Sequence, residues 1–246
     1  MDENKLELTR NKYKLLYHWT RDPLHKYSLP YFGYAQIVLD ELPRPPAPVF
    51  DAGCGDGRIS AELVKQGYKV TGADFLELPV LYARHLVPEG EFFVADLRHD
   101  LVATYGLQEE QFQAVVMVEV YEHIPPEDCL TVLANIRQVL RVGGTLIVSV
   151  PSLKLPMSQL HYRHFDEDQI RDEITKSGFS VQKTIYQHGQ DFLTHLLLSD
   201  IVEGVLNNKW LQPVFLKRLR RHWYMKYGNI ARHSQQCGRY IIIATR

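Results

Sequence analysis

Seven short runs of apolar and β-branched residues recur along the chain, and several of the stretches between them carry apolar residues at helical spacing. Such runs predict strands, and the spaced stretches predict helices. The expected strands are a run ending at Asp51, then 69–74, 91–96, 113–119, 145–150, 179–186 and 239–245. The expected helices cover 58–66, 127–140 and 166–177. This alternation is typical of an α/β fold with a doubly wound sheet covered by helices on both faces.

Residues 1–46 precede the first expected strand and are rich in aromatic side chains. Apolar positions spaced along 31–42 predict a helix, which the prolines of 43–48 end. We expect this N-terminal leader to pack on the domain formed by 47–246. Whether its aromatic residues cover a sheet edge or form a lid over a site stays open.

About fifty residues, 187–238, separate the last two expected strands. An amphipathic helix is expected over 192–206, and Pro213 opens a second one with Phe215, Leu219, Trp223 and Tyr227 at four-residue spacing. Residues 207–240 hold eight lysines and arginines and no acidic residue, although the whole chain has a net charge of −1. The basic residues are Lys209, Lys217, Arg218, Arg220, Arg221, Lys226, Arg232 and Arg239. We expect this insertion to cap the active site and attract an anionic substrate or a membrane surface, the alternative being a solvated basic face.

Composition sets further bounds on the protein. Three widely spaced cysteines among 246 residues fit neither a disulfide framework nor a zinc site, so we expect a cytoplasmic protein. The charged first ten residues are unlike a signal peptide, and no apolar run reaches the roughly 18 residues that a transmembrane helix needs. Neither charge nor composition specifies an oligomeric state.

Three glycines lie at alternate positions in the turn that follows the first expected strand. The pattern is Asp51-x-Gly53-x-Gly55-x-Gly57, directly before the helix predicted over 58–66. Glycines let a ligand approach the backbone, and a helix N-terminus favours a carboxylate or a phosphate. A dinucleotide-binding turn has the spacing G-x-G-x-x-G, so the earlier third glycine favours another ligand.

Acidic residues end four of the expected strands: Asp51, Asp74, Asp96 and Glu119. The carboxyl ends of parallel strands meet at one edge of an open sheet, where ligands bind. A carboxylate after the second strand is placed to accept hydrogen bonds from both hydroxyls of a ribose. Asp74 is therefore a candidate nucleoside ligand.

The glycine turn and the sequence Glu119-Val-Tyr-Glu-His123 resemble motifs of the class I S-adenosylmethionine (SAM)-dependent methyltransferases, in their ubiquinone-biosynthesis branch. The resemblance covers about 47–186 and 239–246, although Val142 replaces a proline of the family's Leu-Lys-Pro-Gly-Gly turn. It implies a seven-stranded Rossmann-like sheet with an antiparallel last strand, SAM as cofactor, and methyl transfer to a small molecule. It implies that Asp96 meets the adenine amino group and that the Leu97 amide faces the ring. The implied cofactor-binding residues are Asp51, Gly53, Cys54, Gly55, Asp74, Phe75, Asp96, Leu97 and Glu119.

Three histidines follow expected strand ends and are candidate bases: His123, His161 and His164. A hydroxyl acceptor gains from a base, whereas a neutral amine needs little more than alignment. This favours O-methylation of an anionic or lipid- or sugar-linked metabolite, with N-methylation as the alternative. A loop-orienting role stays open for His123, and a helix-anchoring role for one of the other two. His161-x-x-His164 with Glu119 lacks a convincing third metal ligand, so no metal is expected.

Two other classes of function remain as alternatives. One is a non-catalytic SAM-binding module, although such modules tend to lose the glycines or the ribose acid, which this chain keeps. The other is a nucleic-acid methyltransferase. Base N-methyltransferases place Asn/Asp-Pro-Pro-Tyr/Phe after the fourth strand, where this chain has Glu119-Val-Tyr-Glu122, so no nucleic-acid partner is expected.

Overall fold

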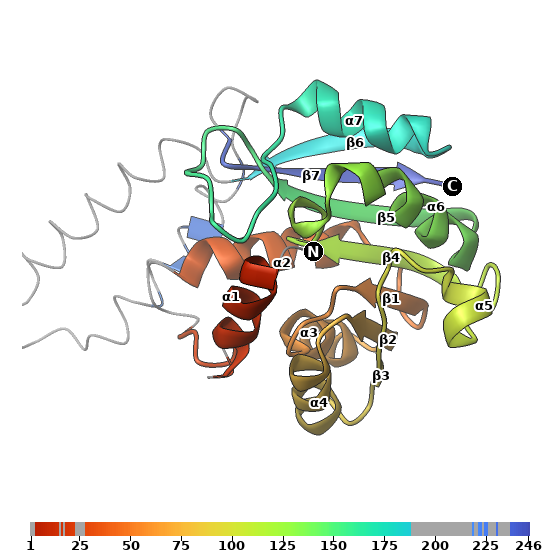
Figure 1. The fold of residues 1–246 in the computed structure, drawn as a ribbon, viewed down its shortest axis with the longest axis horizontal. Helices are drawn as coiled ribbons and strands as arrows, with labels where there is room; N and C mark the ends of the chain where they lie inside the picture. Colours follow the sequence, from red (N-terminus) through yellow and green to blue (C-terminus); the bar gives the residue numbers. More distant parts are fainter. Residues whose placement is uncertain are drawn as a thin grey trace, which may run out of the picture.

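A seven-stranded sheet in the order β3-β2-β1-β4-β5-β7-β6 forms the centre of the protein (Figure 1). The computed structural model describes residues 3–14, 16, 18–22, 28–187, 218, 221–222, 224–225, 230 and 237–246. The strands are β1 (Pro48–Ala52), β2 (Lys69–Asp74), β3 (Glu91–Val94), β4 (Phe112–Val118), β5 (Leu140–Pro151), β6 (Ser180–Gln187) and β7 (Arg239–Thr245). Strand β7 runs antiparallel to both β5 and β6, and the other neighbouring pairs are parallel. The expected sheet and its antiparallel last strand are confirmed.

Helices cover both faces of this sheet (Figure 1). They are α1 (Glu3–Tyr13), α2 (Leu29–Glu41), α3 (Arg58–Lys65), α4 (Glu77–Leu86), α5 (Leu101–Tyr105), α6 (Cys129–Val139) and α7 (Glu167–Lys176). Side chains of α5, α6 and α7 share one core with β4 and β5, and side chains of α2 and α3 share a second core on the opposite face. The sheet is therefore buried on both sides, which explains why strands such as β4 are almost continuously apolar.

Two local signals determine where helices begin. Gly57, with φ of 77°, adopts the left-handed conformation at the N-terminus of α3. A Cβ there would lie 2.9 Å from the Cβ of Ala83, so α4 packs against the glycine turn. Before α7, the Asp166 carboxylate accepts the Gln169 backbone N–H at 2.8 Å and caps the helix.

The order of strands positions the functional site. Strand order runs outward in opposite directions from β1 and β4, which are neighbours in the sheet. Chain connections therefore leave on opposite sides at the carboxyl ends of β1 and β4 and open a crevice there. The glycine turn follows β1, and Glu119 follows β4, so both border this crevice.

Some boundaries differ from those expected. Strand β5 begins at Leu140, five residues early, because Leu140 pairs with Phe112 across a register shift, and the expected turn 141–144 lies within the strand. Helix α2 is confirmed and shares its core with β1 and β4, whereas the spacing did not predict α1, α4 or α5. Among the described residues, no helix is both long and apolar enough to cross a membrane.

Most of the predicted insertion lies outside the described residues, including both of its expected helices apart from isolated positions. Arg239 is an exception, and its assignment to the basic surface was wrong. It is the first residue of β7, and its guanidinium pairs with Glu119, so it does not contribute free positive charge to an insertion surface.

Candidate active site

A pocket opens at the carboxyl edge of the sheet, where the turns after β1, β2, β3 and β4 meet. All nine residues predicted to bind cofactor line it, and so does His123. His161 and His164 do not line it, although their neighbour Leu160 does. The first helix also reaches the pocket through Thr9, Lys12 and Tyr13. The pocket therefore combines the predicted strand edge with the leader, for which a lid over a site was one of the two alternatives left open by the sequence.

The glycine turn has left-handed backbone at Gly53, Gly55 and Gly57, with φ of 86°, 52° and 77°. The amides of Gly53 and Cys54 both donate to the Ala73 carbonyl, at 2.8 and 2.9 Å, and fix the turn to β2. A Cβ at Gly53 would fall against the Val120 side chain, well inside van der Waals contact. The first glycine is thus required by a segment that follows β4 as well as by its own backbone conformation.

Two buried carboxylates hold this turn in place. The Ser60 hydroxyl donates to Asp51 at 2.6 Å, and the amides of Gly55 and Leu76 donate to the two oxygens of Asp74 at 3.1 and 3.0 Å. Burial raises the pKa of Asp51 and of Asp74 to about 6. Each oxygen of Asp74 retains a second lone pair, so this carboxylate can also accept the hydroxyls of a ribose.

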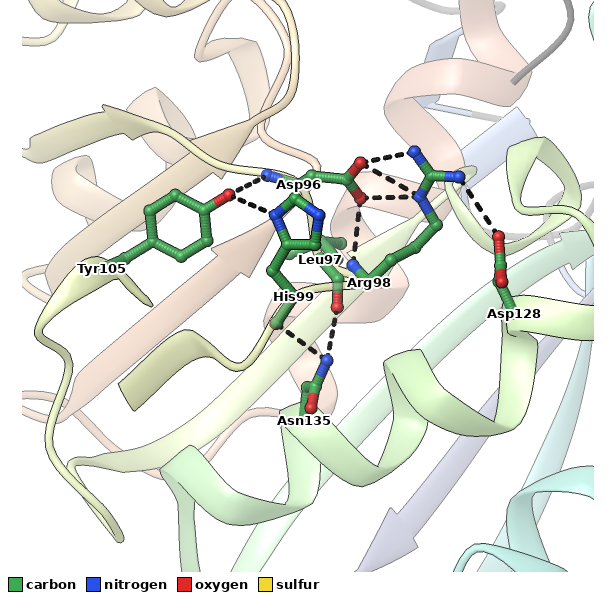
Figure 2. Close-up of polar contacts among 7 residues, drawn as sticks. All are labelled: Asp96, Leu97, Arg98, His99, Tyr105, Asp128 and Asn135. Carbon is green, nitrogen blue, oxygen red and sulfur yellow. Dashed lines mark hydrogen bonds and ion pairs between the residues drawn. The ribbon is translucent and has the colours of Figure 1, made fainter. Parts of the chain in front are cut away.

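Asp96 is held by Arg98, as Figure 2 shows. The guanidinium contacts both oxygens of Asp96 and reaches Asp128 at 3.2 Å, which connects the turn after β3 to the segment before α6. Burial acts to raise the pKa of Asp96, but the hydrogen bonds from Arg98 outweigh it and hold the pKa below its ordinary value. Asn135 donates to the Leu97 carbonyl at 2.9 Å and fixes the next peptide (Figure 2).

Glu119 borders the pocket, but its carboxylate binds residues of the neighbouring strands β5 and β7. Its two oxygens accept the Ser149 hydroxyl at 2.9 Å and Arg239 Nε at 2.7 Å. Its φ of 56° is unusual for a residue with a side chain. These contacts give Glu119 a structural link to β5 and β7 in addition to its place at the pocket.

Three histidines and Glu122 lie together after β4 and β5. His123 Nδ1 lies 3.0 Å from the Leu160 carbonyl, and His164 Nδ1 lies 3.1 Å from the Leu155 carbonyl. A carbonyl only accepts, so both of these nitrogens carry hydrogen. His164 Nε2 is then an acceptor for His161 Nδ1, at 2.8 Å. This assignment leaves Nε2 of both His123 and His161 with a free lone pair.

Glu122 is fully buried beside these rings, and neither of its carboxylate oxygens has a hydrogen-bond partner from another described residue. Ligand atoms of Glu122, His123 and His161 all lie within 4.8 Å of one another. Burial lowers the pKa of His123 to about 4 and of His161 to about 3, and burial together with Glu119 raises the pKa of Glu122. Two neutral imidazoles and a buried carboxylate can bind a cation or an acidic proton.

The leader is attached to both sides of the pocket. On one side, the His18 amide donates to Asp56 at 3.0 Å, and Trp19 Nε1 donates to the Asp56 carbonyl at 2.8 Å. On the other side, Lys5 Nζ donates to the carbonyls of Gln159 and His161 at 2.8 and 2.7 Å.

Sequence reasoning did not select Asp56, Glu122 or the leader contacts as site features. Asp56 lies inside the glycine motif and Glu122 inside the motif after β4, so each stood in a recognised pattern. Lys5 and His18 carried no comparable signal, because their partners lie far away in the sequence.

Comparisons with known proteins agree with this geometry. Residues 49–144 match the family model described as a methyltransferase domain. The ubiquinone biosynthesis O-methyltransferase of Histophilus somni is 31% identical over 133 residues, which are 52% of this chain and 53% of that protein. A probable SAM-dependent methyltransferase of Mycolicibacterium smegmatis is 27% identical over 144 residues, 56% of this chain and 53% of that protein. The chain thus spans about half the length of these curated relatives.

Solved structures share the fold across a larger share of the chain. The 1,6-didemethyltoxoflavin-N1-methyltransferase of Burkholderia thailandensis has a TM-score of 0.58 at 18% identity, covering 99% of this chain and 87% of that one. Phosphoethanolamine N-methyltransferase 2 of Haemonchus contortus has a TM-score of 0.63 at 14% identity, covering 100% and 60%. With the glycine turn and the strand-end acids, these findings show that residues 49–144 are similar to a methyltransferase domain and that the chain has the fold of SAM-dependent methyltransferases.

Proposed function

We propose that this protein transfers the methyl group of SAM to a hydroxyl oxygen of a small molecule. The observation that carries the proposal is the convergence, in one pocket, of the glycine turn, Asp74 and Asp96 with the histidine that follows β4. The first three match the needs of a nucleoside with an amino-acid tail, and His123 lies where an acceptor would meet the methyl group. Methyl transfer requires in-line alignment of the acceptor with the sulfonium carbon, which a shared pocket provides.

The proposed cofactor placement follows the edge of the sheet. The turn at Gly53–Gly55 receives the methionine part, Asp74 accepts the ribose hydroxyls, and Asp96 with the Leu97 amide faces adenine. Asp74 supports this placement because its oxygens keep lone pairs while its other contacts fix the glycine turn. Because Arg98 already occupies Asp96, we propose that Asp96 contributes mainly through the position of its backbone.

Acceptor activation is assigned to Glu122, His123 and His161. Imidazoles with pKa values of about 4 and 3 are weak proton acceptors at neutral pH, whereas a neutral imidazole beside a carboxylate is a common ligand set for a divalent cation. A carbonyl or a second ring fixes the other nitrogen of each imidazole, as in known metal sites. A bound cation would lower the pKa of an acceptor hydroxyl. The metal set rejected from the sequence was His161 and His164 with Glu119, which shares only His161 with this one.

Binding of S-adenosylhomocysteine (SAH), measured by calorimetry, tests the cofactor site. Asp74→Ala should weaken binding by about 1–3 kcal/mol through loss of the ribose hydrogen bonds. Asp100→Ala is the matched control, because Asp100 also follows a strand but caps α5 and does not line the pocket. Equal affinity of the Asp74 variant and the wild type would exclude Asp74 as the ribose ligand, and absence of SAH binding by the wild type would exclude the proposed function.

The acceptor can be identified by incubating the enzyme with SAM carrying a deuterated methyl group and fractionated metabolites, followed by mass spectrometry. With that acceptor, Glu122→Ala, His123→Ala and His161→Ala should each lower kcat about 10²-fold or more and leave SAH affinity within twofold. A chelator should have the same effect on the wild type, with Mg²⁺, Mn²⁺ or Zn²⁺ restoring turnover. His85→Ala on the exposed face of α4 is the control. Full turnover in all of these conditions would instead indicate an amine acceptor.

We also propose that the acceptor is negatively charged. Support comes from 207–238, which holds seven lysines and arginines and no acidic residue once Arg239 is excluded. The triple change of Arg218, Arg220 and Arg221 to glutamine should raise KM for the acceptor, less so at high salt, since screening acts over about 8 Å at physiological ionic strength. Reduced sedimentation with anionic vesicles would assign the charge to a membrane surface. Native KM and native vesicle binding would leave a solvated face as the explanation.

A further inference from the structure

Glu119 has a backbone conformation that needs support from its surroundings. Among the described residues it is one of three non-glycine residues with a positive φ, and it lies directly after β4 at the edge of the pocket. Side chains make this conformation unfavourable, so it persists where neighbouring groups hold it. Such positions are often found where a functional segment must leave a strand in a particular direction.

Residues from two adjacent strands, β5 and β7, hold Glu119. The Ser149 hydroxyl on β5 accepts the Glu119 amide at 3.0 Å and donates to its carboxylate at 2.9 Å, closing a ring of hydrogen bonds. Arg239 on β7 donates from Nε to the other carboxylate oxygen at 2.7 Å. The guanidinium carbon lies over the Tyr34 ring of α2, 5.4 Å from the ring centre. The side chains of Glu119, Ser149 and Arg239 are therefore held in a site that is largely shielded from solvent.

The antiparallel direction of β7 makes this arrangement possible. The first residue of an antiparallel strand lies at the edge where its parallel neighbours end, and Arg239 pairs with Pro151, the last residue of β5. A parallel strand in the same place would put its first residue at the opposite edge. Figure 1 shows that β7 runs opposite to β5. This direction places Arg239 at the carboxyl edge of the sheet, where its guanidinium pairs with Glu119 at the end of β4.

The residues that follow Glu119 are those that the pocket needs in fixed positions. Val120 lies against Gly53 in the glycine turn, and the Val120 carbonyl accepts the His123 amide at 2.9 Å. Any rotation at Glu119 would therefore move Val120 against the glycine turn and also move the 3₁₀ turn that carries Glu122 and His123.

We propose that Arg239 is a positioning residue that acts through Glu119, with Ser149, to align the segment after β4 with both the cofactor and the acceptor. The inference rests on the proposed function, because it gives Arg239 a role in the same site. Arg239 fixes the carboxylate, the carboxylate and Ser149 fix the left-handed backbone, and the backbone places Val120 and His123. Arg239 itself touches neither reacting group in this arrangement.

The test compares Arg239→Met with Arg246→Met. Arg246 directly follows β7 and lies at the opposite edge of the sheet from Arg239. It pairs with Glu110 and donates to the Leu140 carbonyl. We expect Arg239→Met to weaken SAH binding at least tenfold and to lower kcat further, with Arg246→Met changing SAH affinity less than twofold. Both variants should unfold at lower temperature, so stability alone would not produce the difference in binding. Equal SAH affinity of the two variants would overturn the inference.

Two milder changes keep the test informative if Arg239→Met does not fold. Ser149→Ala removes one hydroxyl, and we expect about a three- to tenfold loss of SAH affinity. Arg239→Lys keeps the charge and should recover part of the binding lost in Arg239→Met. Native affinity in Ser149→Ala, with native circular dichroism, would overturn the inference. Absence of SAH binding by the wild type would instead reject the proposed function.

Discussion

The two halves of the pocket are built in different ways. In the half assigned to the cofactor, local contacts set the turns, as between Asp74 and the Leu76 amide and between Asp96 and Arg98, and Asp128 and Asn135 add contacts from further along the chain. In the half assigned to the acceptor, contacts join distant segments, as between Lys5 and the His161 carbonyl or between Glu119 and Arg239. Local turns after the strands therefore contribute strongly to the first half, whereas contacts from the leader and from β7 hold the second.

Gly53 and Val120 join the two halves, so the largest expected effect comes from disturbing their contact. Gly53→Ala should weaken SAH binding by 10²-fold or more, because the added Cβ meets Val120 and the backbone is left-handed. Gly106→Ala is the matched control: Gly106 has φ of 75° but open space around its missing Cβ. Calorimetry should therefore show near-native SAH affinity for the Gly106 variant.

Val120→Ala in the Gly53→Ala background separates contact from backbone strain. If the contact carries the effect, the double variant should bind SAH at least tenfold more tightly than Gly53→Ala. No recovery would mean that the two halves are not coupled at this point.

The difference between the halves also determines how much could be predicted from the sequence. The sheet, its antiparallel last strand and the acids at the carboxyl ends of β1 to β4 follow from strand periodicity and from the motifs that the sequence resembles. The partners of Glu119 and His161 could not be predicted, since Ser149 and Lys5 approach them only in the folded chain. Arg239 was assigned to a basic surface for the same reason: charge counting along a sequence cannot detect a carboxylate 120 residues away.

The buried acids of the cofactor half should lower the free energy of unfolding at neutral pH relative to pH 4. The pKa of Asp51 is about 6, against an ordinary value of 3.8, so its ionisation costs the folded state stability as pH rises through 6. Asp51→Asn can still accept the Ser60 hydroxyl and should raise the free energy of unfolding at pH 7.5 by about 2–3 kcal/mol. Urea denaturation should show little gain at pH 4, where the folded protein already holds the proton. An equal gain at both pH values would rule out ionisation as the cause.

Cofactor affinity should depend on pH through Asp74. Its carboxylate faces the amides of Gly55 and Leu76, with Lys12 and Asp56 also acting on it, and its pKa is about 6. Protonation removes acceptor capacity for the ribose, so SAH binding should weaken as pH falls through 6, by up to about tenfold at pH 5. The dependence should be absent in Asp74→Asn and retained in Asp51→Asn. A pH profile unchanged by Asp74→Asn would assign the titration to another group.

The smallest expected effects come from the leader. Because this one segment contacts both halves of the pocket, its two sets of contacts can be removed separately. His18→Ala removes the ring contact with Asp56, 2.9 Å long, and should increase the SAH dissociation rate about two- to fivefold, as expected for one net hydrogen bond. Lys5→Met removes the contacts with the carbonyls of Gln159 and His161 and should raise KM for the acceptor while leaving SAH release unchanged. Lys14→Met, at an exposed position of the same leader, should alter neither. Stopped-flow kinetics measures the SAH dissociation rate, and steady-state kinetics measures KM for the acceptor. If the His18 and Lys5 variants change these two quantities in the same way, the leader covers the pocket as one unit and does not distinguish the two halves.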